Sequence, residues 1–369
     1  MVLAADERED DGALPVAASH SGTMEAGQRG GELVGRGAGD AMSEVPITTP
    51  TEARERVERL LATYRQERER AVTALREDRD HFAARLRQTW ADAVDAYDFC
   101  TIVAHKIGQA FHIKHQAGAV ARNDATFEAL TRLHSQAMVV ASEVRALLLA
   151  GYAQGALARS RSMHELAVIA TFIVEHGQET SERFIAHKDF EEYRLLKTYH
   201  DYAVQSGLPG LDEAALAAAK TRRDQLRQTY DKRVLEDYGW AGGAICPTSK
   251  KQAITFRHLE QAADLEDGRP YYRLASGAIH IGSLGNSAHI LSVDGIKTYS
   301  VAPSIRGLHQ PAGATLVALL HCTFIYLSLA WDEYHDPGPL AEVHVLTTLV
   351  QEATGLLLST ERELEARFD

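Results

Sequence analysis

The chain has 369 residues, of which 45% are hydrophobic, 24% are charged and 7% are aromatic. This composition is typical of a globular protein and excludes collagen-like, disulfide-scaffold and wholly disordered chains. The formal net charge of −12 is unevenly spread, because the first 50 residues hold nine acidic and three basic residues and so contribute half of it. No basic excess indicates a nucleic-acid or membrane partner from charge alone.

The N-terminal segment, residues 1–47, is rich in Gly, Ala and acidic residues and lacks hydrophobic periodicity. We expect a disordered tail, because such a segment buries too little apolar surface to offset its ordering entropy. Met24 or Met42 is an alternative start, and no secretory signal is expected because the required basic and apolar regions are missing. Helical order is expected from Thr49, which can form a capping box with Glu52.

A long, heavily charged amphipathic helix is predicted over residues 48–99. Most of its apolar residues are three, four or seven positions apart, which is close to the coiled-coil period: Val57, Leu61, Tyr64, Val72, Leu75, Phe82, Leu86, Trp90, Val94 and Tyr97. We interpret it as a helix that packs on the rest of the protein or on a second subunit. A nucleic-acid clamp is the alternative, and it is disfavoured because acidic residues match the basic ones.

The remainder, residues 100–369, is predicted to be a helical bundle domain. Helices are expected at about 100–176, 180–205, 211–237, 250–265, 270–283, 312–335 and 339–366. The Asn123-Asp124 pair is predicted to form a cap between helices, and Gly177 is predicted to end one. A small β-hairpin is expected near residues 290–300, where an Asp-Gly pair is flanked by alternating residues. The predicted fold class is therefore all-α, a multi-helix bundle with one small hairpin and a long N-terminal helix.

A run of apolar residues from Thr315 to Trp331 is slightly short of a membrane span and contains His321. We interpret it as a buried core helix and expect no membrane association. The three cysteines include no CxxC pair, which suits a reducing compartment and argues against a disulfide framework. The expected location is the cytoplasm.

Several chemical signatures are missing from the sequence, including a phosphate-binding loop, HExxH and a Gly-x-Ser-x-Gly elbow. His105, His112 and His115 lie in one helical segment, but no carboxylate at helical spacing completes a metal site. We therefore expect packing or surface roles for these histidines, and neither a metal nor a cofactor.

A polar stripe is predicted on the helix near residue 276, because Tyr272, Ser276 and His280 step four residues at a time. Arg273 lies seven residues before His280 and almost in line with it. The neighbouring small residues allow a close approach to other helices. A buried polar stripe needs partners.

Arg161 and Glu165 are the expected partners, because they lie on one side of a helix that is apolar almost all round. Long charged residues are almost never fully buried unless they are paired. One interpretation is a buried ion pair that fixes helix register. The other is a pocket in which His280, an arginine and Glu165 bind an anion and transfer protons.

The chain resembles the bacterial domain-of-unknown-function family 5677 in three motifs, taken in order. These are Leu148–Tyr152 through Arg161–Glu165, then Tyr238-Gly239-Trp240, then Tyr272–Ser276 with His280. The resemblance covers roughly residues 125–285 and implies that Arg161, Glu165, Tyr272, Ser276 and His280 are the residues that matter. It implies no activity.

The chain is more distantly similar to HEPN proteins, helical bundles whose signature is Arg, four to six residues, then His. Arg159 with His164 matches this spacing, as does Arg273 with His280, although Leu274 replaces the usual polar residue after the second arginine. The similarity implies a metal-independent ribonuclease at a homodimer interface. In such a site His280 is the general acid or base, and Arg273 or Arg161 stabilises phosphorane charge.

These patterns favour three alternative functions. The most specific is a ribonuclease or toxin-like effector of a bacterial, anti-phage type of system, with RNA as its partner and a dimer formed through the long N-terminal helix. Arg222, Arg223, Arg227, Lys232 and Arg233 are the basic residues that could contact RNA. A non-catalytic binding, sensor or partner protein and an enzyme for a small anionic metabolite are the alternatives.

Overall fold

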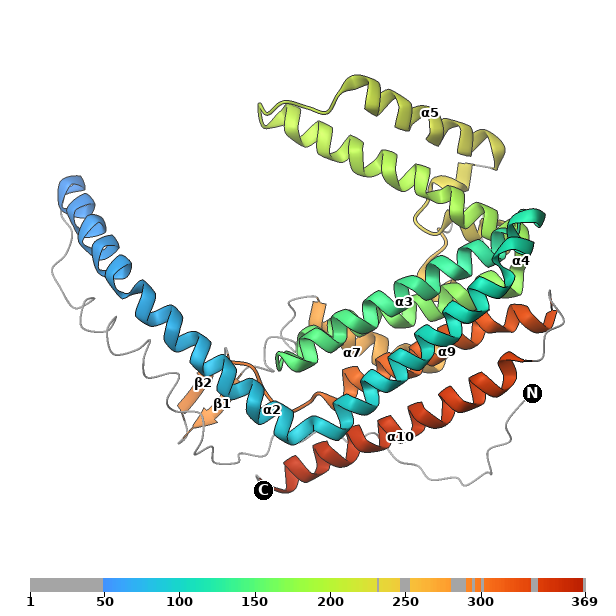
Figure 1. Cartoon of the computed structure of the whole chain (residues 1–369). Coiled ribbons are helices and arrows are strands. Elements are labelled where there is room, and N and C mark those ends of the chain that lie inside the picture. The colour runs from blue at the N-terminus through green and yellow to red at the C-terminus, as the bar shows by residue number, and fades with distance from the viewer. Residues whose placement is uncertain are drawn as a thin grey trace. The chain divides into compact units, whose positions relative to one another are not determined.

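The computed structural model describes residues 49–230, 232–245, 253–279, 290–293, 296–299, 302–332 and 338–367. The fold is all-α, as predicted (Figure 1). The chain divides into two compact units, one made of residues 1–73, 289–300 and 363–369, and the other of residues 74–288 and 301–362. The larger unit contains the bundle and the candidate site. The predicted tail at residues 1–47 lies outside the described residues.

The first described helix, α2, runs from Pro50 to Arg122 without a break and passes through residue 99, where the sequence suggested a boundary. The predicted capping box begins it: Thr49 N donates to Glu52 Oε2 at 2.9 Å, and Glu52 N donates to Thr49 Oγ1 at 3.3 Å. From Phe82 onward the helix has a buried face, whereas the residues before it are almost all exposed. The first part of this continuous helix is therefore exposed to solvent, and the part from Phe82 onward contributes to the core.

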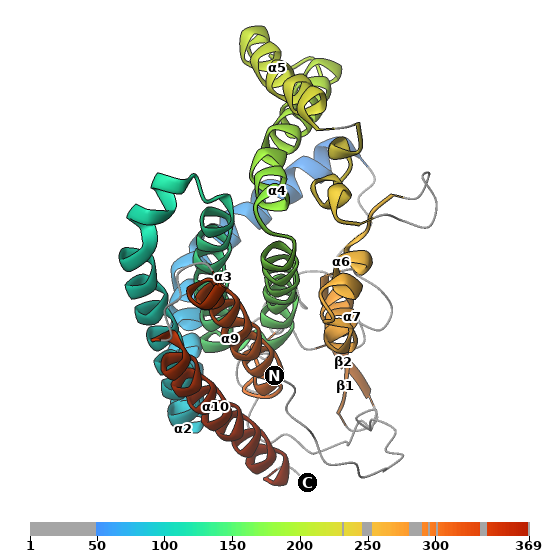
Figure 2. The same ribbon diagram turned by 90° about the vertical axis from the view of Figure 1, so that its right-hand side faces the viewer.

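The bundle core forms where α3 (Ala125–Leu149), the first half of α4 (Ala153–Gln205) and α9 (His309–Asp332) pack on one another (Figure 2). The largest fully buried side chains include Trp90, Leu130, Phe172, Leu316 and Tyr326. By length and composition, the His309–Trp331 segment of α9 could cross a membrane, and 56% of its most apolar window is buried inside the bundle. Burial of this apolar helix accounts for much of the core.

Two helix boundaries are determined by residues at the boundary itself, Asp124 and Gly177. Asp124 caps α3, with its side chain accepting from Phe127 N at 2.8 Å. Gly177 adopts φ 66° and ψ −152°, a conformation that other residues rarely reach, and it divides α4 into two helical halves. The predicted end of a helix at Gly177 is therefore correct.

The second half of α4 pairs with α5 (Glu213–Thr229), which begins at the cap residue Asp212. The sequence pattern predicted that this helix continues to residue 237. Instead it ends at Thr229, and two 3₁₀ helices follow, η1 (Lys232–Leu235) and η2 (Gly239–Gly243). The glycines around Trp240 favour these short turns over a regular α-helix.

Three short elements complete the site region: α6 (Phe256–Ala262), η3 (Glu266–Gly268) and α7 (Arg269–Ile279). The strands β1 (Ile290–Val293) and β2 (Ile296–Tyr299) form an antiparallel pair. Asp294 and Gly295, where the sequence places a tight turn, lie outside the described residues. The last helix is α10 (Pro339–Ala366).

A loop before α9 joins three parts of the larger unit. Trp90 Nε1 of α2 donates to Ile305 O at 2.9 Å, and Ser304 N donates to Gly151 O at 2.9 Å. Gly307 N donates to the buried carboxylate of Glu361 in α10 at 2.8 Å. These bonds hold the ends of the bundle helices together.

Candidate functional site

The site is built on one face of α4, where Arg161 and Glu165 lie one turn apart. Their side chains form an ion pair, with Arg161 Nη2 2.9 Å from Glu165 Oε1. Helix α7 packs on α4 (Figure 2). This packing brings the Tyr272 hydroxyl to the ion pair. Tyr272 accepts a hydrogen bond from Arg161 Nη2 and donates one to Glu165 Oε1 at 3.0 Å. We call these three residues the Arg–Glu–Tyr cluster.

The guanidinium of Arg161 also lies over the Tyr272 ring, 4.5 Å from its centroid. A cation over an aromatic face gains electrostatic attraction in addition to its hydrogen bonds. Hydrogen bonds at the edge of the guanidinium and the Tyr272 ring against its plane together define the orientation of Arg161. The side chains of Arg161 and Glu165 remain 23% and 30% exposed, so solvent and small solutes can reach the cluster.

The remaining predicted residues take different places. Ser276 is half-buried, and its hydroxyl donates to the backbone carbonyl of Tyr272 at 2.7 Å. Arg273 is exposed on α7 and has no contact with the cluster among those the structure describes. His280, the predicted acid or base, lies outside the described residues. The structure thus joins Arg161, Glu165 and Tyr272, with Ser276 one turn away.

The site keeps its phenols protonated. Burial is the main cause that raises the pKa of Tyr272, and the nearby Glu165 carboxylate adds to the rise while Arg161 opposes it. Burial and Glu165 also raise the pKa of Tyr238 to about 12. Burial opposes the charge of Arg161, but the Tyr272 hydrogen bond and Glu165 together raise its pKa. At neutral pH the site therefore offers a cation and neutral hydroxyl donors.

An aromatic wall, which the sequence did not predict, supports the cluster. Phe256 of α6 stacks on Tyr272 with centroids 5.1 Å apart, and Tyr238 lies 6.2 Å from Phe256. The Tyr238-Gly239-Trp240 motif was visible in the sequence, but its position beside Glu165 depends on contacts between distant segments. Hydrophobic periodicity carries no information about such contacts.

A second polar group lies beside the cluster. His164 Nε2 is 3.0 Å from Glu260 Oε1, and the other oxygen of Glu260 is paired with Arg269. The sequence drew attention to His164 through its spacing from Arg159 and its place in the Arg161–Glu165 motif. Arg159 itself contacts Glu143 and Ser162, away from this group.

Two of the three predicted α2 histidines, His112 and His115, contact aromatic residues, and His105 is exposed. His112 Nδ1 lies 3.3 Å from the Tyr326 hydroxyl, and the His115 ring lies 4.6 Å from that of Phe111. Across the described part of the chain, no group of three or more His, Cys, Asp or Glu side chains could hold a metal ion.

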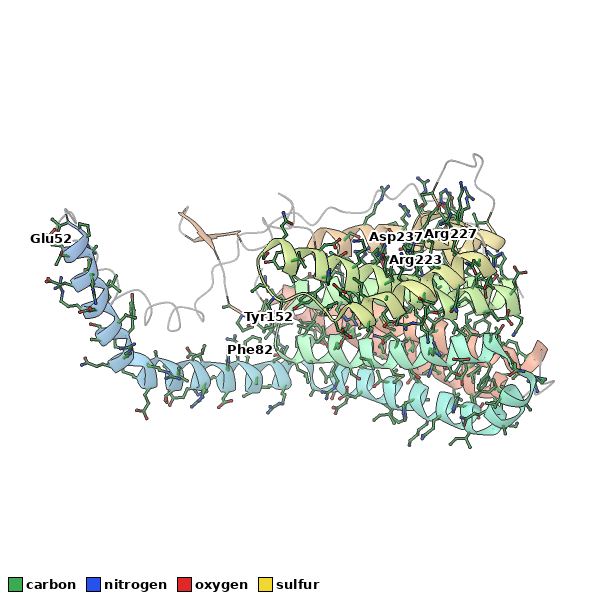
Figure 3. The ribbon with its side chains drawn as sticks, turned by 90° about the horizontal axis from the view of Figure 1, so that it is seen from above. Glu52, Phe82, Tyr152, Arg223, Arg227 and Asp237 are labelled. Carbon is green, nitrogen blue, oxygen red and sulfur yellow. The ribbon has the colours of Figure 1, made fainter. Side chains whose placement is uncertain are left out.

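The basic residues of α5 are partly neutralised. Arg222 pairs with Asp189 and Glu192 of α4, at 3.5 and 2.9 Å. Arg223 stacks on the Tyr193 ring at 4.5 Å, whereas Arg227 is exposed (Figure 3). This helix therefore provides fewer free cations for a polyanion than its sequence suggested.

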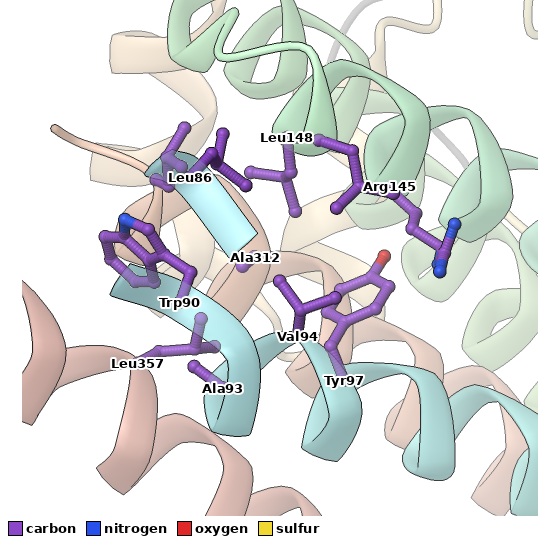
Figure 4. A pocket seen from close by; sticks show the side chains of 11 residues that line it. Leu86, Trp90, Ala93, Val94, Tyr97, Arg145, Leu148, Ala312 and Leu357 are labelled. Atoms are coloured by element: carbon purple, nitrogen blue, oxygen red, sulfur yellow. The ribbon is translucent and has the colours of Figure 1, made fainter. Parts of the chain in front are cut away.

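An apolar cavity elsewhere in the bundle is too small for a ligand (Figure 4). Its volume is about 20 Å³, which is room for about one water molecule. Trp90, Tyr97 and Leu357 are among its lining residues, and Arg145 at its side is held by Asp98, with Nη2 2.5 Å from Oδ2. The partly exposed Arg–Glu–Tyr cluster is the stronger candidate site.

The fold and site define a helical-bundle protein with a polar cluster shared between two helices. Residues 127–297 match the model of a family described as Family of unknown function (DUF5677). The matched part of the chain contains the Arg–Glu–Tyr cluster, the aromatic wall and Glu260. No curated protein matches the chain, and no solved structure matches it. The similarity to HEPN proteins stays a prediction.

Proposed function

We propose that the chain is a metal-independent ribonuclease, a toxin-like effector of a bacterial and anti-phage type of system that acts in the cytoplasm. The observation that carries this proposal is the Arg–Glu–Tyr cluster, in which a cation, a carboxylate and a phenol meet at a partly exposed surface. Cleavage of RNA beside a 2′-hydroxyl requires a base, an acid and a positive charge near phosphorus. The cluster has one group for each role.

In the proposed step, the Glu165 carboxylate takes the proton of a ribose 2′-hydroxyl. The 2′-oxygen then forms a bond to the adjacent phosphorus while the bond to the 5′-oxygen breaks. Tyr272 gives its proton to the departing 5′-oxygen and regains one from Glu165 across their 3.0 Å hydrogen bond. Arg161 stabilises the negative charge that develops on the phosphate oxygens. The products are a 2′,3′-cyclic phosphate and a 5′-hydroxyl, and the protein returns to its starting protonation.

Burial raises the pKa of Tyr272, so the phenol is protonated at neutral pH and enters the proposed step with its proton in place. Arg273 is exposed on the same helix and is available to attract the phosphate backbone. His280 remains a second proposed acid or base.

The test uses the full-length protein and a 5′-labelled RNA oligonucleotide in excess EDTA. Wild-type protein is expected to cleave the RNA, and Glu165→Gln and Arg161→Gln are each expected to reduce kcat by about 10²–10³-fold. Glu175→Gln is the matched control, because Glu175 is an exposed acid on the same helix. His280→Ala and Arg273→Ala test the two remaining predicted residues.

One observation favours a second candidate, a non-catalytic binding or sensor protein. The polar contacts described for Arg161 Nη2 come from Glu165 and Tyr272 of the same chain, so they form without a substrate, whereas the buried Nε of Arg161 has no hydrogen-bond partner among the described residues. In this case Arg161→Gln would lower the free energy of unfolding by about 1–3 kcal/mol. Neither the wild-type protein nor any variant would then cleave RNA.

The proposed protein is a homodimer through the first part of α2. Val57, Leu61 and Tyr64 lie four and three residues apart on this helix, and their exposed fractions are 54%, 44% and 60%. An apolar stripe with coiled-coil spacing is stabilised when it packs against another helix. A second copy of the chain supplies an identical stripe.

A further inference from the structure

Glu260 is a buried acid that lies outside the Arg–Glu–Tyr cluster. Its side chain, on α6, is 0% exposed and binds two partners. Oε1 lies 3.0 Å from His164 Nε2, and Oε2 is paired with the guanidinium of Arg269. A carboxylate only accepts hydrogen bonds, so His164 Nε2 carries the hydrogen of this contact. Glu260 thereby favours a hydrogen on Nε2 of the His164 ring.

The two partners of Glu260 belong to the two helices that form the cluster. His164 directly precedes Glu165 on α4, and Arg269 begins α7, about one helical turn before Tyr272. One carboxylate therefore ties both helices close to the positions where their side chains meet. A buried charge needs partners, so this link is costly to break.

Close packing restricts the same junction. Phe256, also on α6, stacks on Tyr272 at 5.1 Å and meets the His164 ring edge-on at 5.9 Å. A Cβ atom at Gly268 would lie 2.5 Å from His164 Cε1, so a glycine is needed there for the chain to approach the ring. The His164 ring is hydrogen-bonded to Glu260 through Nε2, and Gly268 lies close to its Cε1 atom.

We propose that Glu260 is a positioning residue, which acts through His164 and Arg269 to set α7 against α4 so that the Tyr272 hydroxyl meets Arg161 and Glu165. This role in cleavage rests on the proposed function. Glu260 itself does not touch substrate, because its side chain is fully buried. Its effect is on the placement of the phenol, and misplacement of a reacting group by about 1 Å can reduce a rate by about 100-fold.

The kinetic test compares Glu260→Gln with Glu266→Gln, which alters an exposed acid on η3. Glu260→Gln is expected to lower kcat by about 100-fold with KM changed less than about 3-fold, because the phosphate-binding Arg161 is retained. Glu266→Gln is expected to behave like wild type. An unchanged kcat in folded Glu260→Gln overturns the proposal. If this variant does not fold, Arg269→Lys replaces it, since lysine keeps the charge and loses the planar fork.

A spectroscopic test does not depend on activity. ¹⁵N-histidine NMR reports the tautomer of each ring, and loss of one signal in His164→Gln assigns His164. The wild-type protein is expected to show the Nε2–H tautomer, and Glu260→Gln is expected to show a mixture. A His164 signal that is identical in both proteins contradicts the positioning role. If neither the wild-type protein nor any variant cleaves RNA but the tautomer changes as expected, the positioning of His164 by Glu260 is supported and the ribonuclease proposal fails.

Discussion

The Tyr272 hydroxyl is central to the site at the scale of single residues, because it contacts both members of the α4 ion pair. It accepts from Arg161 and donates to Glu165, so its two hydrogen-bonding capacities are both used. Hydrogen bonds to charged groups are stronger than those between neutral groups. The hydroxyl should therefore contribute to stability as well as to any chemistry.

Tyr272→Phe tests this contribution, since it removes the hydroxyl and keeps the ring stacked on Phe256 and beneath Arg161. We expect the free energy of unfolding to fall by about 1–2 kcal/mol, a value reduced by the partial exposure of the ion pair. Urea denaturation measures it. Tyr271→Phe is the control, because the neighbouring Tyr271 is 60% exposed. Equal losses in the two variants would show that the hydroxyl contacts are not stabilising.

At the scale of elements, the first part of α2 packs little against the other residues that the structure describes. Residues 50–81 extend over about 48 Å at 1.5 Å per residue, and most of their side chains are exposed. Exposed pairs such as Arg54 with Glu58, 3.4 Å apart, add only a few tenths of a kcal/mol each. Helices in proteins draw most of their stability from packing an apolar face. A partner helix would supply that packing.

Leu61→Glu is expected to separate the proposed dimer, because it places a charge in the centre of the apolar stripe. Light scattering after size exclusion should show twice the 40.5 kDa chain mass for the wild-type protein and a single chain mass for the variant. Thr63→Glu, which adds the same charge at an exposed position on another face, should remain dimeric. A monomeric wild-type protein would refute dimerisation through α2.

At the scale of the whole molecule, the bundle core contains a histidine that is held neutral. Burial lowers the pKa of His134 to about 4, with a smaller effect from His105. His134 Nε2 lies 3.2 Å from Thr323 Oγ1, and its ring stacks on Tyr326 at 5.2 Å. The folded state thus resists a proton that the unfolded chain accepts below pH 6.5.

The stability that this neutral histidine provides should be present in full above pH 6.5 and should decline as the pH falls toward 4. The loss is roughly 3 kcal/mol, because each pKa unit corresponds to about 1.4 kcal/mol. Urea denaturation between pH 7 and 4.5 measures it for the wild-type protein, His134→Gln and the exposed-site control His344→Gln. His134→Gln should lose less stability over this range than the other two. Parallel pH profiles for all three proteins would assign acid sensitivity to other groups.

Sequence patterns predicted the all-α class, the capping box at Thr49, the Asp124 cap and the helix break at Gly177, because each depends on nearby residues. They also placed Arg161 and Glu165 on one helix face and suggested α7 as their partner. They did not identify Glu260 or Phe256, and they did not place Tyr238 beside the cluster, because these positions come from contacts between distant segments. The early end of α5 was missed because tertiary packing and glycine-rich turns override helical periodicity.

The most direct test of the central claim is to identify the ends of RNA after incubation with full-length protein in EDTA. Mass spectrometry distinguishes a 2′,3′-cyclic phosphate and its paired 5′-hydroxyl from other cleavage products. The proposed roles of Glu165, Tyr272 and Arg161 predict these ends from the wild-type protein and their loss in Glu165→Gln. Intact RNA from the wild-type protein, or the same ends from Glu165→Gln in equal yield, would contradict the account.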